Sequence, residues 1–128
     1  LEQWSKHEWF GLGLGRFGGA VAANHKLAPF YMDNYYLKTL VEMGLYGAIA
    51  LVVLLLFVVF QLYRIARRQT TAFGKYMTAS ILAGVIAVLI HNGVENIFEI
   101  PYVVTYFWFY VAMGVDFGKQ PFIQGNEA

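Results

Sequence analysis

Residues 43–63, MGLYGAIALVVLLLFVVFQLY, form the stretch that decides the fold, because none of these 21 residues is charged. A helix needs about 20 mostly apolar residues to cross the hydrocarbon core of a bilayer. Two further runs without Asp, Glu, Lys or Arg follow, residues 76–94 and 100–115. The sequence therefore predicts an all-α, polytopic membrane segment with three transmembrane helices, at about 35–68, 73–94 and 101–118.

The composition also indicates a membrane protein. Of the 128 residues, 59% are hydrophobic and only 13% are charged, whereas about 25% of the residues of a soluble domain are charged. The absence of cysteine excludes disulfides and thiolate chemistry. The formal net charge of +1 favours no class of partner, and we expect no nucleic acid partner and no cofactor.

Basic residues predict the orientation, because short cytoplasmic loops retain Lys and Arg. The link between the first two predicted spans, residues 64–75, has four cations and no acid, so we expect it in the cytoplasm. The next link, residues 91–99, has two acids and neither Lys nor Arg, which suits the opposite side. Residues 1–34 then form an extracytoplasmic loop and residues 119–128 a cytoplasmic tail. An outside N-terminus without a signal peptide leads us to expect the C-terminal part of a larger polytopic protein.

Local signals mark the helices and their contacts. Asp33 or Asn34 is a candidate N-cap for the first helix, and Pro101 suits the first turn of the third. Gly44 and Gly47 make the outer half of the first helix slim, which favours a close approach by another helix. A stripe of alanines four residues apart predicts close packing of the second helix: Ala79, Ala83 and Ala87.

A glycine-rich stretch, GLGLGRFGG at residues 11–19, contains the G-x-G-x-x-G spacing of dinucleotide sites. A strand and a βαβ unit should accompany such a site, and here a proline-containing loop and a membrane span follow, so we reject nucleotide binding. Two interpretations of the turn stay open. Its backbone N–H groups and Arg16 could bind a phosphate ester, or the glycines pack tightly and Arg16 meets lipid headgroups.

Other polar residues of the predicted outer side are candidates for function. His25 could carry a proton, and Asp33 could be a cap, a base or both. His91, Glu95 and Glu99 are spaced by four residues, which would place them on one helical face able to bind a metal. Gly93 and Pro101 argue against a continuous helix there, so we expect a polar cluster and no metal site. We also expect an ion pair between Lys38 and Glu42.

Two stretches, GLGLGRF at 11–17 and DNYYLKTLVEMGLYG at 33–47, resemble the C-terminal part of the O-antigen ligase and polymerase family. These bacterial membrane enzymes transfer sugar chains from an undecaprenyl-diphosphate carrier to an acceptor. The ligase motif is His, then Asn, Ser or Gln, nine residues, Gly, two residues, Gly and Thr. This chain keeps the spacing, with Asp33 in place of the histidine and Ala48 in place of the threonine.

The resemblance implies a metal-independent glycosyltransferase whose partners are an undecaprenyl-diphosphate-linked oligosaccharide, an acceptor glycan and membrane lipid. Arg16 would bind the diphosphate. Asp33 would be the catalytic base in place of the family histidine, with His25 as the alternative base. We add a set of candidate substrate-binding residues at the same outer mouth: Asn34, His91 and Glu95.

The expected protein is a polysaccharide polymerase or ligase of the bacterial plasma (inner) membrane, with its site facing outside or the periplasm. The missing ligase histidine favours a polymerase. Further arginines of the family would lie before residue 1, so this segment alone should be inactive. The competing interpretation is a non-catalytic or transport module, in which the outward-facing acids line a path.

Overall fold

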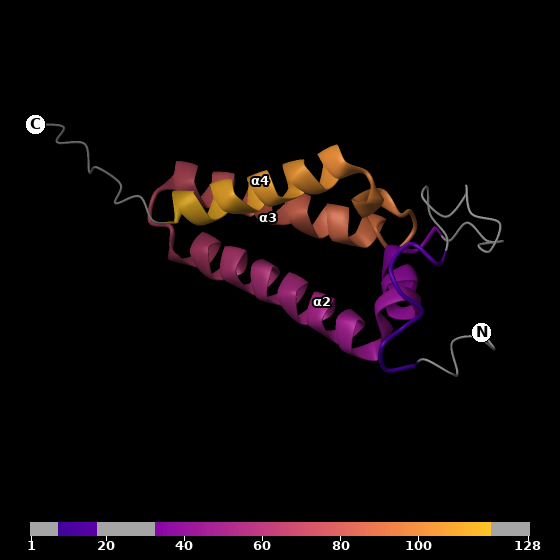
Figure 1. Ribbon diagram of the computed structural model, residues 1–128. Coiled ribbons are helices and arrows are strands. Elements are labelled where there is room, and N and C mark those ends of the chain that lie inside the picture. The colour runs from indigo at the N-terminus through magenta and orange to yellow at the C-terminus, as the bar shows by residue number, and fades with distance from the viewer. Residues whose placement is uncertain (1–7, 18–32, 119–128) are drawn as a thin grey trace, which may run out of the picture.

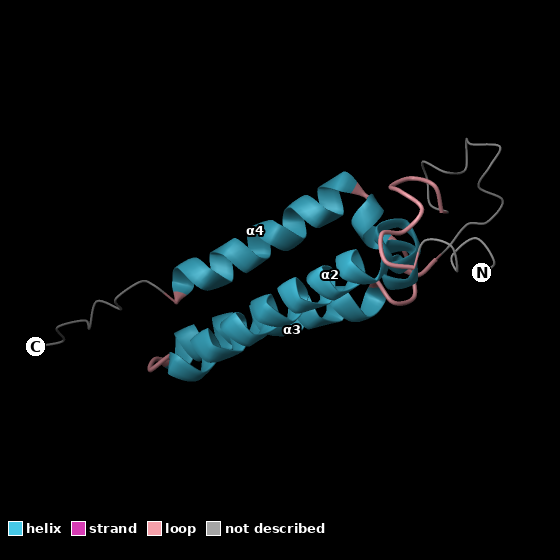
Figure 2. Ribbon diagram, turned by 60° about the horizontal axis from the view of Figure 1, so that its bottom comes forward, coloured by secondary structure: helices cyan, strands magenta, loops and turns pink. Residues whose placement is uncertain are grey.

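The computed structural model describes residues 8–17 and 33–118 of the chain. All regular structure in these residues is helical, in the order α2 (Tyr35–Arg68), α3 (Ala72–His91), the short 3-10 helix η2 (Ile97–Glu99) and α4 (Pro101–Phe117). The three long helices lie side by side, and each runs opposite to the one before it (Figures 1 and 2). The described part of the chain is therefore an all-α bundle, as the apolar runs predict.

Two of these helices, α2 and α3, are long and apolar enough to cross a membrane. Only 17% and 22% of their most apolar windows are buried inside the structure, whereas the core helix of a soluble protein is covered by its neighbours. α4 has 17 residues and is about 25 Å long, less than the roughly 30 Å of a hydrocarbon core. The third membrane span therefore stays a prediction.

The helix α2 is broken at Gly44, where the sequence predicts a continuous helix. Gly44 has a φ of 69° and a ψ of −173°, which lie outside the helical region. The break separates a short first part, residues 35–43, from a long second part, residues 45–68. Figure 1 shows the first part turned sharply away from the axis of the second. The prediction of one continuous helix is therefore wrong at Gly44, where the helix bends.

The core lies where the second part of α2 meets α3 and α4. It consists of buried apolar side chains from all three helices: Leu55, Val58, Leu62, Ile81, Val85, Phe107 and Val111. Gly114 of α4 permits this close approach, since a Cβ there would lie 2.7 Å from Leu62 Cδ2 and 3.0 Å from Ile81 Cγ2. These contacts hold the three helices together, and the loop before α2 and the loop between α3 and α4 lie at the same end of the bundle.

The alanine stripe of α3 is not part of this core. Ala79, Ala83 and Ala87 are all exposed. The buried face of α3 carries Thr78 and two apolar residues, Ile81 and Val85, instead. The stripe therefore packs against none of the described helices, and the close packing predicted for it is wrong within this bundle.

Helix ends follow the expected chemistry more closely. Asn34 is the N-cap of α2, and its side chain accepts a hydrogen bond from the Leu37 N–H group. Thr71 caps α3 in the same way, through the Gly74 N–H group. Pro101 occupies the first turn of α4, where its missing N–H group costs no hydrogen bond, so that prediction is confirmed.

Candidate functional site

A glycine-rich loop is bound to the break in α2. We call residues 8–17 the strap. The backbone N–H groups of Leu12 and Gly13 donate to the carbonyl oxygens of Val41 and Glu42, each at 2.9 Å. In the other direction, the Leu45 N–H group donates to the Glu8 carbonyl oxygen, also at 2.9 Å. The strap therefore supplies partners to the last carbonyls of one helical part and to the first N–H of the next.

Two glycines make this contact possible. Gly11 and Gly44 both have a positive φ, 71° and 69°, a conformation that glycine adopts without steric cost. A Cβ on Gly11 would lie 2.3 Å from the Glu42 carbonyl oxygen, and one on Gly44 would lie 2.4 Å from the Trp9 carbonyl oxygen. The two backbones touch directly, so the tight-packing interpretation of the glycine-rich stretch is confirmed at Gly11. The phosphate interpretation of Arg16 is independent of this result and stays a prediction.

Aromatic side chains cover the outside of the break. The rings of Trp9 and Phe10 lie 5.5 and 5.9 Å from that of Tyr46. All three side chains are more than half exposed. Such partly exposed aromatic clusters are typical of the interface between a membrane and water, and the strap thus supplies aromatic residues at the level where α2 begins to be continuously apolar.

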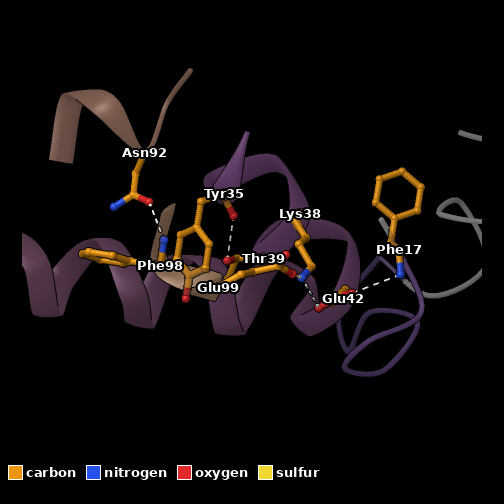
Figure 3. Close-up of polar contacts among 8 residues, drawn as sticks. All are labelled: Phe17, Tyr35, Lys38, Thr39, Glu42, Asn92, Phe98 and Glu99. Carbon is orange, nitrogen blue, oxygen red and sulfur yellow. Dashed lines mark hydrogen bonds and ion pairs between the residues drawn. The ribbon is translucent and has the colours of Figure 1, made fainter. Parts of the chain in front are cut away.

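Three charged side chains lie between the first part of α2 and η2, with Lys38 and Glu42 buried and Glu99 largely buried. The ammonium group of Lys38 pairs with a carboxylate oxygen of Glu99 and lies 3.9 Å from Glu42 Oε2. The three side chains are only 9%, 14% and 6% exposed, in that order. Glu42 Oε1 also accepts a hydrogen bond from the Phe17 N–H group at 3.0 Å. Figure 3 shows the chain of contacts from η2 through Lys38 and Glu42 to the strap.

The energetics of this buried trio favour a positioning function. Burying charges is costly, and the attraction between them offsets the cost only where the pairs are well placed. An apolar contact would hold the same elements together without that cost. Buried charges are therefore weak evidence that these residues serve mainly to stabilise the fold. They do fix one arrangement: η2, the first part of α2 and the end of the strap are held together by directional contacts.

Asn34 joins the start of α2 to the end of α3. Its Oδ1 accepts from the Leu37 N–H group at 3.0 Å, and its Nδ2 donates to the Gly93 carbonyl oxygen at 2.8 Å. The neighbouring Tyr35 N–H group donates to the Asn92 carbonyl oxygen at 3.0 Å. Of the two candidates for the cap, Asn34 forms the bond, and Asp33 just before it is exposed to solvent.

His91 and Glu95 form a separate exposed pair. His91 Nε2 and Glu95 Oε2 are 3.0 Å apart, and the side chains are 56% and 66% exposed. α3 ends at His91, so Glu99 leaves the shared helical face and turns inward to Lys38. The described residues contain no group of three His, Asp or Glu side chains placed to hold a metal ion.

The loop between α3 and η2 also contains buried amides that the sequence interpretation missed. Asn92 is fully buried, and its Oδ1 accepts from the Phe98 N–H group at 3.2 Å. Asn92 Nδ2 and both polar side-chain atoms of Asn96 are buried and have no partner among the described residues. Burying amide groups in this way is unfavourable. Only the density of polar residues in the stretch HNGVEN, residues 91–96, could have indicated it.

The predicted site residues divide into three groups. Arg16 and Asp33 are exposed at the strap end, and Asn34 is held between α2 and α3. His91 and Glu95 contact each other at the end of α3. His25 lies outside the described residues. The structure connects Arg16 to the end of the first part of α2 through its neighbour Phe17, and connects Asp33 to the residue after Asn92 at the end of α3 through its neighbour Asn34.

Comparison of the chain with protein-family models, with curated proteins and with solved structures gives no match in any of the three.

Proposed function

We propose that this chain is the C-terminal part of a membrane glycosyltransferase that polymerises or ligates lipid-linked oligosaccharides. One observation carries the proposal. The two stretches that resemble the O-antigen ligase and polymerase family, residues 11–17 and 33–47, contact each other through the strap and the break in α2. Stretches far apart in a sequence that form one polar end of an apolar bundle are expected at a site for an amphipathic substrate.

The reaction would use an exposed cation and an exposed base. The hydroxyl oxygen of the acceptor sugar attacks the anomeric carbon of the donor, and the bond from that carbon to the diphosphate oxygen breaks. Asp33 accepts the hydroxyl proton, and undecaprenyl diphosphate leaves with the electron pair. Arg16 stabilises the negative charge on the diphosphate. A single displacement of this kind inverts the anomeric carbon. His25 is the alternative base.

The other polar residues would support these two. Asn34 already bonds Leu37 and Gly93, so its main contribution would be to fix the position of Asp33. His91 and Glu95 are exposed and could bind sugar hydroxyl groups. The buried trio of Lys38, Glu42 and Glu99 would hold the strap, and with it Arg16, against α2.

The proposal includes a membrane placement. α2, α3 and α4 would each cross the plasma membrane, with α4 aided by its flanking residues. The strap end would face outside or the periplasm, because the α2–α3 turn carries the cations that short cytoplasmic loops retain. A polymerase is favoured over a ligase, because Asp33 stands where the ligase motif has histidine.

A transport module is the second candidate. The observation that favours it is the buried Lys38, Glu42 and Glu99 trio next to apolar helices, since ionisable residues at membrane depth often mark an ion path. Solute or proton flux through vesicles that depends on Glu42 and Glu99, without any sugar transfer, would support this candidate.

The test uses the complete polytopic protein, reconstituted in vesicles with an undecaprenyl-diphosphate oligosaccharide and an acceptor. We expect Asp33→Ala to lower the transfer rate by about 10²-fold or more. Arg16→Ala should lower it by a similar factor, and Arg16→Lys by less, because lysine keeps the charge but loses the bidentate geometry. Glu8→Ala, an exposed acid on the same strap, is the matched control and should transfer sugars normally. Unchanged sugar transfer in both Asp33→Ala and Arg16→Ala would refute the site.

A further inference from the structure

The end of the bundle opposite the strap carries a group of exposed cations. Arg64, Arg67 and Arg68 lie at the end of α2, Lys75 lies in the first turn of α3, and all four side chains are exposed. Residues 64–75 contain no Asp or Glu. Figure 1 shows the α2–α3 turn at the far end of the bundle from the strap. We call these four residues the basic turn.

The end of α4 lies beside the basic turn and adds little negative charge to it. The ring of Phe117, in the last turn of α4, is 6.5 Å from that of Phe73 at the start of α3. Asp116 is the one acid that the described residues bring to this end, and it is exposed. Among residues 8–17 and 33–118, the strap end has the reverse balance, with two cations, Arg16 and Lys38, against five acids: Glu8, Asp33, Glu42, Glu95 and Glu99.

Exposed aromatic side chains are interleaved with the cations. Tyr63, Phe73 and Tyr76 are 49%, 63% and 76% exposed. The guanidinium carbon of Arg64 lies 5.6 Å from the centre of the Phe60 ring, one turn back along α2. This cation–π contact directs one arginine along the apolar surface of the helix. Aromatic rings and long cationic side chains both favour the headgroup level of a membrane.

We propose that the basic turn binds the phosphate headgroups of anionic phospholipids in the leaflet that it faces. Its cations would contact the phosphates while its aromatic rings lie among the glycerol and upper acyl groups. Each Lys or Arg near an anionic leaflet strengthens the interaction by about fivefold, so four of them give a strong preference over zwitterionic lipid. The proposal uses the membrane placement given above and does not depend on sugar transfer.

The surroundings of the basic turn favour a lipid over a soluble anion. A free phosphate would gain nothing from Tyr63, Phe73 and Tyr76, which flank the cations on the side of the apolar helices, and a nucleic acid would gain nothing from the apolar surface next to these rings. An exposed apolar surface continuous with α2 and α3 adjoins them. A phospholipid matches both parts, because its headgroup is charged and its chains are apolar.

The test measures lipid binding to the purified 128-residue chain in detergent micelles. Phosphatidylglycerol or phosphatidylcholine is added, and bound lipid is counted by native mass spectrometry. We expect the native chain to bind phosphatidylglycerol at least about tenfold more tightly than phosphatidylcholine. A variant with Gln at all four positions of the basic turn should lose this preference. Variants with a single Gln should each weaken phosphatidylglycerol binding by about fivefold.

The matched control keeps every charge: Arg64→Lys, Arg67→Lys and Arg68→Lys together should leave the preference within about twofold of the native value. Equal binding of the two lipids by the native chain would overturn the proposal, as would a preference that survives the Gln variant. Displacement of phosphatidylglycerol by millimolar inorganic phosphate would indicate a free-anion site and would also overturn it. Because no sugar is present, failure here is separate from failure of the proposed reaction.

Discussion

The two ends of the bundle handle charge in opposite ways. At the strap end, Lys38, Glu42 and Glu99 are buried and paired, and they connect three segments of the chain. At the other end, the cations of the basic turn are exposed around a short link between two helices. Buried pairs impose a geometry, whereas exposed charges present a potential. The strap end is thus suited to holding groups in place, whereas the basic turn presents its cations to its surroundings.

The largest expected effect is at the buried trio. Lys38→Met should lower the free energy of unfolding by about 3 to 5 kcal/mol, because it removes one partner of a buried ion pair and leaves carboxylates behind. The measurement is unfolding of the chain in detergent micelles by increasing dodecyl sulfate, followed by circular dichroism.

The double variant Lys38→Met with Glu99→Leu is the control for this loss. It removes both partners, so it should recover more than half of the stability, since apolar replacements of buried pairs are often neutral. If the free energy of unfolding of Lys38→Met lies within about 1 kcal/mol of the native value, the charges at the strap end are no more important for stability than exposed ones.

A smaller effect is expected at the break. Gly44→Ala should cost about 2 to 4 kcal/mol, because it forces a side chain into a positive φ and against the Trp9 carbonyl oxygen. Gly84→Ala is the matched control, since a Cβ there meets nothing within 4 Å, and it should be neutral or raise the stability by up to about 1 kcal/mol. Both variants are measured by the same unfolding experiment. Equal free energies of unfolding for the two would mean that the break at Gly44 does not contribute to binding the strap.

The smallest effects are expected for exposed charges at either end. His91→Ala removes a pair in which both side chains are more than half exposed, and Arg67→Gln removes an exposed cation. Each should change the free energy of unfolding by less than about 0.5 kcal/mol. A larger change in His91→Ala would show that its pair with Glu95 contributes to the geometry of the strap end, which would sharpen the boundary between positioning charges and exposed ones.

Features that depend on near neighbours in the chain could be predicted from the sequence. The apolar runs give the helices of the bundle, Pro101 marks the start of α4, and the four-residue spacing gives the Lys38 and Glu42 pair. Asp33 and Asn34 were equal candidates for the cap, because both side chains can accept the same hydrogen bond.

Features that depend on distant contacts could not be predicted. The break at Gly44 exists because the strap, some thirty residues earlier in the chain, supplies the hydrogen bonds that the interrupted helix lacks. The pairing of Lys38 with Glu99 requires α3 to bring η2 back beside the first part of α2. The face of α3 that packs in this bundle could not be predicted for the same reason, since the four-residue spacing of the alanines does not say which face the neighbouring helices cover.

The strap is a single loop that bonds both the end of one helical part and the start of the next. The hydrogen bonds at Leu12, Gly13 and Leu45 join the same two backbone segments, so we expect them to break together. The strap end should then open and close as one unit, separate from the core formed by the three helices. Local opening would free the loop that carries Arg16 while the rest of the bundle stays folded.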